Sequence, residues 1–345
     1  MTLYGGIDLH SNNNVVALTD ETDRVVYRKR LTNDVETVSA ALAPYRDEIT
    51  GVVVESTYNW YWLVDALMEA GYRVHLANTA AIIQYSGLKY ADDDTDAAWL
   101  AKLLRLGLLP EGYIYPKAER AVRDLLRRRQ SLVQQHTANI LAVQNLFSRN
   151  RGRSISANDA RRLTPESVAE LVAEPNLALA IQGTVLAMRG QQAAIELLER
   201  EAWRQSKETR NWRALQSVSG IGRILGLTIL LETGPIERFK SVGNYASYCR
   251  CVGSTHVSNG KQKGKGNTKN GNKYLAWAYV EAANFAVRYN PQIKRYYQRK
   301  RAKNKTVVAI KAVAHKLARA CYHILREGSE FDVNHAFAST QLGMP

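Results

Sequence analysis

The N-terminal third of the chain is built from short apolar runs separated by polar turns and by helical patterns. Residues 24–31 alternate apolar and charged positions, which is typical of a half-buried strand, whereas 51–55 is a short continuous apolar run ending in an acid. Three strands in a row, followed by alternating strands and helices, predict a mixed sheet with helices packed on it. The predicted elements are strands 3–9, 15–19 and 24–31, helix 35–45, strand 51–55, helix 58–70, strand 73–77 and helix 93–106.

Residues 117–213 follow a helical pattern almost throughout. Within them Ile181, Val185, Met188, Gln192 and Ile195 recur at alternating spacings of four and three. This spacing is typical of a coiled-coil seam, here interrupted by a glutamine, but also of one amphipathic face in an ordinary helical bundle. Both interpretations stay open at this stage.

The last third of the chain is predicted to be mainly helical. Helices are predicted at about 272–288, 291–303 and 306–326, and the Gly/Lys-rich stretch 258–273 is predicted to be a loop from its composition. The fold class is therefore α/β plus all-α. We divide the chain into an α/β domain at 1–115, a helical linker or oligomerisation region at 116–213 and a C-terminal domain at 214–345.

Composition narrows the class of protein. The 345 residues are 46% hydrophobic and 23% charged, as in ordinary globular proteins. An apolar run of about 18 residues, the length that a membrane helix needs, does not occur. Three cysteines do not suggest a disulfide framework. We therefore expect a cytoplasmic protein that does not span a membrane.

The net charge of +15 is concentrated in one part of the chain. Residues 240–326 contain 19 Lys or Arg and a single acidic residue, Glu281. A solvated surface usually mixes charges of both signs, so this near-exclusion of acids favours binding to nucleic acid. The C-terminal domain is the predicted nucleic-acid-binding part.

Four acidic residues in the α/β domain are candidates for a metal site. Asp8 lies inside an apolar strand, Glu55 ends the next core strand, and Asp93 and Asp96 share a helix face three residues apart. Carboxylates are the preferred ligands of Mg²⁺, and phosphodiester cleavage commonly uses two such ions about 3.5–4 Å apart. The sequence therefore predicts a Mg²⁺ site that serves phosphate chemistry.

Each acid also has a structural interpretation. The run from Asp92 to Asp96 could mark only a helix N-terminus, where acids favour the helix dipole, and Glu55 could be a surface residue. Asp8 is harder to explain without a partner, since an acid inside an apolar strand is costly.

Several glycines and basic residues are candidates for contacts with nucleic acid. Gly220 and Gly222 form a Gly-x-Gly turn between two helical patterns, and such a turn can bring backbone N–H groups against a phosphate, although a tight turn needs glycine anyway. The basic candidates are Lys261, Lys263, Lys265, Lys269, Lys273, Arg299, Lys300 and Arg301.

The strand and helix order together with the four acids resembles the RuvC-like branch of the RNase H-like fold. The whole chain resembles transposases of the "one-ten" insertion-sequence family, which are DEDD recombinases guided by a bridge RNA. Each motif alone is modest, but their order and spacing cover nearly all of the chain. The matching segments are Gly6–Asp8, Val54–Tyr58, Asp93–Ala97, Leu215–Gly222, Tyr245–Tyr248 and Ser258–Lys273.

The resemblance implies one further catalytic residue and several partners. Ser258 corresponds to the serine nucleophile of the family's C-terminal domain, a role that composition alone would not suggest. The family further implies a covalent phosphoserine link, donor and target double-stranded DNA, a structured guide RNA and a homo-oligomer, either a dimer or a tetramer, acting at the bacterial nucleoid. Asp92 and Asp94 flank the position of Asp93, so either of them could replace it as a ligand.

Two other functions fit parts of the sequence. A hydrolytic nuclease, such as a junction resolvase, would use the four acids with water alone and would not need Ser258. A non-catalytic RNA-binding protein would need neither the acids nor the serine. Substituting Ser258 or Asp8 would separate these alternatives.

Overall fold

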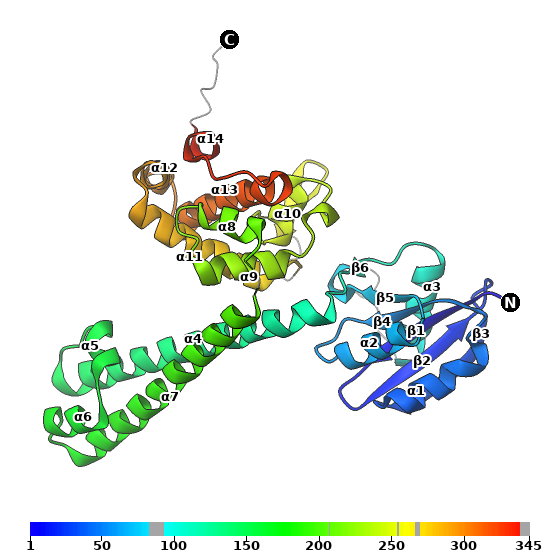
Figure 1. The fold of residues 1–345 in the computed structure, drawn as a ribbon, viewed down its shortest axis with the longest axis horizontal. Coiled ribbons are helices and arrows are strands. Elements are labelled where there is room, and N and C mark those ends of the chain that lie inside the picture. Colours follow the sequence, from blue (N-terminus) through cyan, green and yellow to red (C-terminus); the bar gives the residue numbers. More distant parts are fainter. Residues whose placement is uncertain (83–92, 207, 254, 266–269, 339–345) are drawn as a thin grey trace, which may run out of the picture. The chain divides into compact units, whose positions relative to one another are not determined.

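The computed structural model describes residues 1–345 apart from 83–92, 207, 254, 266–269 and 339–345. It describes only the backbone at Asp93, Asp94, Thr255–Ser258, Gln262, Gly264 and Lys265. The chain divides into two compact units, Met1–Lys117 and Ala118–Pro345 (Figure 1). No helix among the described residues is long and apolar enough to cross a membrane.

A six-stranded mixed sheet forms the centre of the first unit, with the order β3-β2-β1-β4-β5-β6. The three N-terminal strands pair antiparallel as a meander, β4 and β5 then add in parallel to β1, and β6 closes the edge antiparallel to β5. The strands are β1 Leu3–Leu9, β2 Asn13–Thr19, β3 Val25–Thr32, β4 Ile49–Glu55, β5 Val74–Ala77 and β6 Glu111–Gly112.

Helices cover both faces of this sheet (Figure 1). Helices α1 (Val35–Leu42) and α2 (Tyr61–Glu69) pack on the face formed by side chains such as Ile7 and Val54. Helix α3 (Asp93–Arg105) packs on the opposite face, where Val53 meets Leu100. Successive residues of a strand point to opposite faces, so Asp8 and Glu55 lie on the α3 face together.

The second unit begins with two long helices that lie side by side. Helix α4 (Lys117–Arg151) and helix α7 (Pro175–Gln205) are connected at one end through α5 (Ala157–Arg162) and α6 (Pro165–Leu171) (Figure 1). The 4-3 seam of α7 is buried against α4 of the same chain, with Ile181, Val185 and Met188 in one core with Ile140, Val143 and Phe147. Gln192, where the seam is interrupted, is exposed.

The remaining helices form a separate core around α13 (Thr306–Glu327), whose buried face includes Val313, Leu317 and Cys321. The cysteines of this unit are free thiols, as the sequence predicted. The surrounding elements are α8 Arg210–Gln216, α9 Arg223–Thr233, α10 Val242–Tyr248, β7 Thr255–Ser258, β8 Lys261–Lys265, α11 Lys273–Tyr289, α12 Pro291–Arg301 and α14 Val333–Phe337.

The observed elements confirm the predicted fold class, a mixed α/β sheet followed by a mostly helical remainder. The prediction of a loop across 258–273 was wrong for its first half, which pairs as the β7–β8 hairpin. Asn259 and Gly260 connect the two strands with φ values of 51° and 70°. Asn-Gly is the preferred pair for a two-residue turn of this kind, because both positions need positive φ. The loop was predicted from the Gly/Lys-rich composition of the whole segment, which does not register a turn signal of two residues.

Candidate functional site

Asp8 lies near the carboxyl end of β1, on the face covered by α3. The residue is 4% exposed, and its Oδ2 atom lies 3.3 Å from Nε2 of His10. A buried carboxylate is costly unless positive charge or good donors surround it. A cation bound to the Asp8 carboxylate would offset this cost.

Glu55 lies beside Asp8 because β1 and β4 run parallel. The register pairs Ile7 with Val54, so the two acids follow at the same end of neighbouring strands. Burial raises the pKa of Glu55 to about 8, with further contributions from a hydrogen bond to Asp8 and from the negative charges of Asp8 and Asp96. A protonated Glu55 can donate to the Asp8 carboxylate. The acids therefore lie close enough for their negative charges to disfavour ionisation of Glu55.

A close approach between α3 and β1 brings Asp96 to the same place. A Cβ atom at Gly6 would lie 1.9 Å from the backbone oxygen of Ala97, so only glycine allows this contact. Ala97 is completely buried, and Asp96 directly precedes it. Asp96 is half-buried, and its charge contributes to the raised pKa of Glu55. Two of the other predicted acids, Asp8 and Asp96, therefore act on Glu55.

The fourth predicted acid, Asp93, is the first residue of α3, and only its backbone is described. Asp94 is described in the same way, and Asp92 lies outside the described residues. The choice of Asp93 over its two neighbours stays a prediction.

The carboxylates fit a divalent cation in their chemistry. Hard cations bind carboxylate oxygens, and a cation here would offset the repulsion that raises the pKa of Glu55. Among the described side chains, no three His, Cys, Asp or Glu residues are grouped closely enough to hold a metal ion. Glu55 is hydrogen-bonded to Asp8 and feels the charge of Asp96, so these three acids are the candidates for the donor set.

Asparagines that the sequence reasoning did not single out hold the loops beside the acids. The backbone oxygen of His10 accepts hydrogen bonds from Nδ2 of Asn33 at 2.9 Å and from Nδ2 of Asn59 at 3.0 Å. Oδ1 of Asn59 in turn accepts from Oγ1 of Thr57 at 2.8 Å. The bond from Asn59 joins the segment after β1 to the segment after β4. Asp8 is in β1 and Glu55 is in β4. In the sequence, the sign of these hydrogen bonds is the presence of asparagines close to the strand ends.

Ser258 is the last residue of β7, and its backbone pairs with that of Lys261 across the turn. Only its backbone is described. Lys261 and Lys263 are exposed on β8, and Lys273 is exposed at the start of α11. Of the remaining lysine candidates, Lys265 is described by its backbone, and Lys269 lies outside the described residues.

The two glycines of the Gly-x-Gly turn differ in their surroundings. Gly220 has a φ of +91°, and a Cβ there would lie 2.2 Å from the backbone oxygen of Ala282 in α11. Packing and conformation therefore explain Gly220 without a ligand. Gly222 is exposed at the N-cap of α9, where its surroundings are open.

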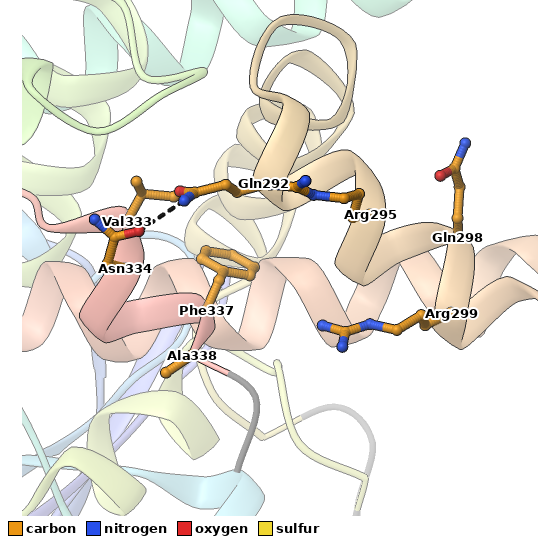
Figure 2. A pocket seen from close by; sticks show the side chains of 8 residues that line it. All are labelled: Gln292, Arg295, Gln298, Arg299, Val333, Asn334, Phe337 and Ala338. Carbon is orange, nitrogen blue, oxygen red and sulfur yellow. Dashed lines mark hydrogen bonds between the residues drawn. The ribbon is translucent and has the colours of Figure 1, made fainter. Parts of the chain in front are cut away.

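The basic end of α12 borders a hollow of about 450 Å³ (Figure 2). Arg299 lines it together with Arg295, one helical turn earlier, and both are exposed. Nε2 of Gln292 donates to Oδ1 of Asn334 across the hollow at 2.6 Å. Lys300 and Arg301 are also exposed. Arg295 is not among the basic residues predicted from the sequence, although its spacing of four from Arg299 places both on one helix face.

Two models of known protein families match the chain, one in each part of the sequence. Residues 5–149 match the family model for the DEDD transposase of IS110, and residues 212–298 match the model described as Transposase IS116/IS110/IS902 family. The first match contains Asp8, Glu55 and Asp96, and the second contains Ser258. No curated protein matches the chain. The six-stranded mixed sheet with helices on both faces is consistent with the RNase H-like fold of DEDD transposases.

Proposed function

The chain belongs to the IS110 family of DEDD transposases, and on that premise we propose that it exchanges DNA strands through a covalent link to Ser258, under the guidance of a structured RNA. It is a DNA transposase, and its substrates are DNA. The arrangement of Asp8, Glu55 and Asp96 is the structural observation that supports metal-dependent strand cleavage, and the family match supports the role of Ser258.

The family match indicates that the protein uses a divalent metal. We propose Mg²⁺, held by Asp8, Glu55, Asp93 and Asp96. A bound Mg²⁺ polarises a scissile phosphate and offsets charge on the leaving oxygen. The buried position of Asp8 and the parallel pairing of β1 with β4 would keep the first two carboxylates oriented without further rearrangement.

Ser258 would supply the nucleophile. Its hydroxyl oxygen loses its proton and bonds to the phosphorus of a DNA phosphodiester, and the bond from phosphorus to the leaving deoxyribose oxygen breaks as that oxygen takes up a proton. The energy of the phosphodiester is kept in the serine–phosphate bond. A free hydroxyl end of another strand can then attack that phosphorus, which restores the serine and joins the new strands.

The remaining partners follow from charge and from the family. The basic C-terminal domain would hold both DNA and a guide RNA, with target choice set by base pairing. The long helices α4 and α7 would mediate assembly into a dimer or tetramer with active sites shared between protomers. The protein would act at the nucleoid of a bacterial cell. The domain division 1–115, 116–213 and 214–345 stays part of the proposal.

The acids can be tested by isosteric substitution. We expect Asp8→Asn and Glu55→Gln each to abolish strand cleavage of a plasmid carrying the element's ends, with DNA binding retained. Glu69→Gln is the matched control, because Glu69 is an exposed acid of the same unit, on the surface of α2. Full cleavage by Asp8→Asn would refute the role of the carboxylates.

RNA guidance is tested separately, by sequencing RNA that co-purifies with the protein expressed from its own locus. We expect one structured RNA encoded beside the gene. A random sample of cellular RNA would refute guidance and leave the transposase assignment intact.

A further inference from the structure

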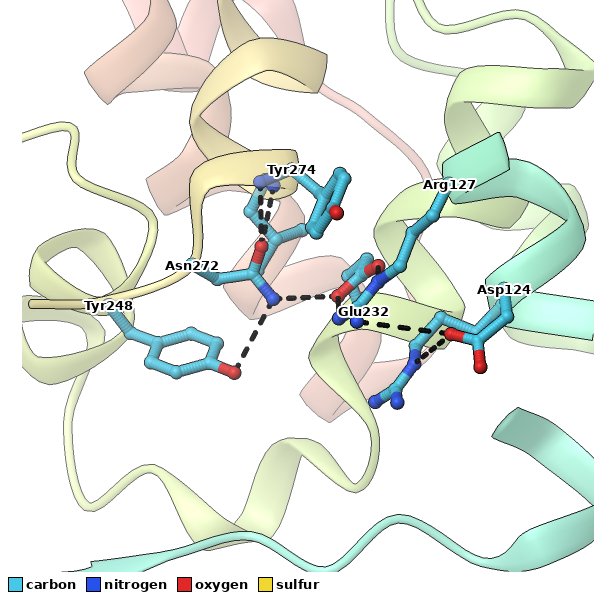
Figure 3. Close-up of polar contacts among 8 residues, drawn as sticks. Asp124, Arg127, Glu232, Tyr248, Asn272 and Tyr274 are labelled. Carbon is cyan, nitrogen blue, oxygen red and sulfur yellow. Dashed lines mark hydrogen bonds and ion pairs between the residues drawn. The ribbon is translucent and has the colours of Figure 1, made fainter. Parts of the chain in front are cut away.

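Glu232 is an acid buried in the second unit. It lies on α9 and is 1% exposed. Arg127 of α4 binds it with both arms of its guanidinium, Nε to Oε1 at 2.6 Å and Nη2 to Oε2 at 2.8 Å (Figure 3). Nδ2 of Asn272 donates to the same Oε2 at 2.7 Å. Three helices, α4, α9 and α11, therefore meet at one carboxylate.

Asn272 uses both ends of its amide. While Nδ2 binds Glu232, Oδ1 accepts from the backbone N–H groups of Tyr274 at 2.8 Å and Leu275 at 3.0 Å and so caps α11. Its own backbone N–H donates to the oxygen of Tyr248 at 2.6 Å. Because each of these bonds fixes a different atom, Asn272 has one orientation only.

Asn272 also closes the loop that carries Ser258. The guanidinium of Arg250 donates to the backbone oxygen of Gly271 from Nε at 3.0 Å and from Nη2 at 2.8 Å. A Cβ at Gly271, where φ is +87°, would lie 2.6 Å from the oxygen of Tyr248. Tyr248, Arg250, Gly271 and Asn272 thus form the neck of a loop, residues 251–270, that contains Ser258 and four of the lysines proposed to bind nucleic acid.

A buried charged network is not needed for stability alone. Apolar side chains of similar volume often stabilise such a position as well or better, whereas directed hydrogen bonds to a carboxylate fix orientation. The carboxylate of Glu232 orients Asn272, and Asn272 holds the neck. The network therefore fixes the two points of the chain between which the 251–270 loop runs.

We infer that Glu232 and Asn272 are positioning residues, which hold the neck of the 251–270 loop and thereby place Ser258 for attack on DNA. This inference rests on the proposed role of Ser258. Arg127 extends the support to α4 and stacks on Tyr274, with its Cζ atom 4.4 Å from the ring centroid.

Asn272→Asp tests the inference, because aspartate caps a helix as well as asparagine but cannot donate to Glu232. Asn272→Ser keeps the cap as well, without adding a charge, should the aspartate unfold the protein. Glu199→Gln is the matched control: it removes another carboxylate partner of an α4 arginine, Arg129, at 2.7 Å, away from the neck.

Two measurements are made on the full-length protein. Hydrogen–deuterium exchange of the peptide covering 255–265 reports the order of the hairpin, and the rate of covalent protein–DNA adduct formation reports the chemistry. We expect Asn272→Asp and Asn272→Ser to raise the exchange and to slow adduct formation by about 10- to 100-fold, with the Kd for DNA unchanged. We expect Glu199→Gln to match wild type.

Wild-type exchange and rate in both Asn272 variants would overturn the inference. If wild-type protein forms no adduct, the proposed function fails. The exchange data would then still decide whether Glu232 and Asn272 hold the neck.

Discussion

At the scale of single residues, Glu55 is a largely buried acid whose pKa is strongly raised. Its pKa of about 8 means that the folded protein keeps a proton on Glu55 over a pH range in which the unfolded chain, with an ordinary value of 4.5, has lost it. The folded state therefore loses stability as pH rises from about 4.5 to about 8. In the presence of a chelator, we expect the melting temperature to fall over this range.

Glu55→Gln should flatten this dependence, and measuring Tm by differential scanning fluorimetry at several pH values checks it. Adding Mg²⁺ at pH 8 should raise the Tm of wild-type protein, because a ligand that binds only the folded state stabilises it by about 2.7 kcal/mol at 100 times its Kd. An unchanged pH dependence in Glu55→Gln would contradict this account.

The sequence was sufficient to single out Asp8 and Glu55, because acids inside or at the end of apolar strands are unusual and the family motifs contain both. It could not reveal the asparagines that hold His10, or the pairing of Glu232 with Arg127. Arg127 and Glu232 are 105 residues apart, and no periodicity relates residues on separate helices. Resemblance supplied Ser258, whose surroundings give no chemical signal in the sequence.

At the scale of elements, the contact between Gly6 and α3 determines where Asp96 lies. Gly6→Ala places a methyl group 1.9 Å from the backbone oxygen of Ala97, so α3 must move away from β1. Overpacking of this kind costs about 1–3 kcal/mol. We expect lower stability in urea unfolding and a loss of cleavage activity larger than the loss of folded protein.

Gly5→Ala is the control for this prediction, because Gly5 faces the other side of β1 and its Cβ would meet only side-chain atoms of Val52 and Leu18, at 3.2 Å and 3.3 Å. Equal effects of the two substitutions would show that the approach of α3 does not matter.

The β7–β8 turn provides a second test at this scale. Gly260 has a φ of +70°, which a β-branched residue rarely adopts but asparagine tolerates. Gly260→Val should therefore open the hairpin, and Gly260→Asn should preserve it, as judged by amide exchange of Lys261–Lys265. If both variants retain wild-type protection, the turn is not what orders the hairpin.

The elements also show where prediction from sequence succeeded. The strands β1 to β5 and the helices α11, α12 and α13 lie within a few residues of their predicted bounds, because apolar periodicity is strong there, whereas residues 117–213 were predicted to be helical without bounds for α4 and α7. The hairpin was missed because its composition, rich in Gly, Lys and Asn, is that of a loop. Strand β6 was missed because it has only two residues, too few to show a periodic pattern. The 4-3 seam of α7 predicted a packed face, but only the structure identifies α4 as its intrachain partner.

At the scale of the whole molecule, the positive charge is concentrated near the C-terminal end of the chain. The net charge of +15 comes from the C-terminal third, and Arg295 and Arg299 line a hollow there. Each phosphate contact contributes about 0.7–0.9 to the slope of log K against log salt concentration. We expect Arg295→Gln/Arg299→Gln to lower that slope by about one to two units in anisotropy titrations with DNA and RNA.

Arg204→Gln is the control for the charge prediction, since Arg204 is an exposed arginine on α7 that pairs with Glu201. A double variant with the wild-type slope would exclude the hollow from the nucleic-acid interface for both polymers.

The central claim is that acids in the first unit and Ser258 in the second act in one reaction. The most direct test is to incubate the protein with Mg²⁺, its co-purified RNA and end-labelled donor DNA, and to map any covalent protein–DNA adduct by mass spectrometry. The account predicts an adduct on Ser258 that is absent from Ser258→Ala and from Asp8→Asn. Cleavage that continues in Ser258→Ala and leaves protein-free DNA ends would contradict it.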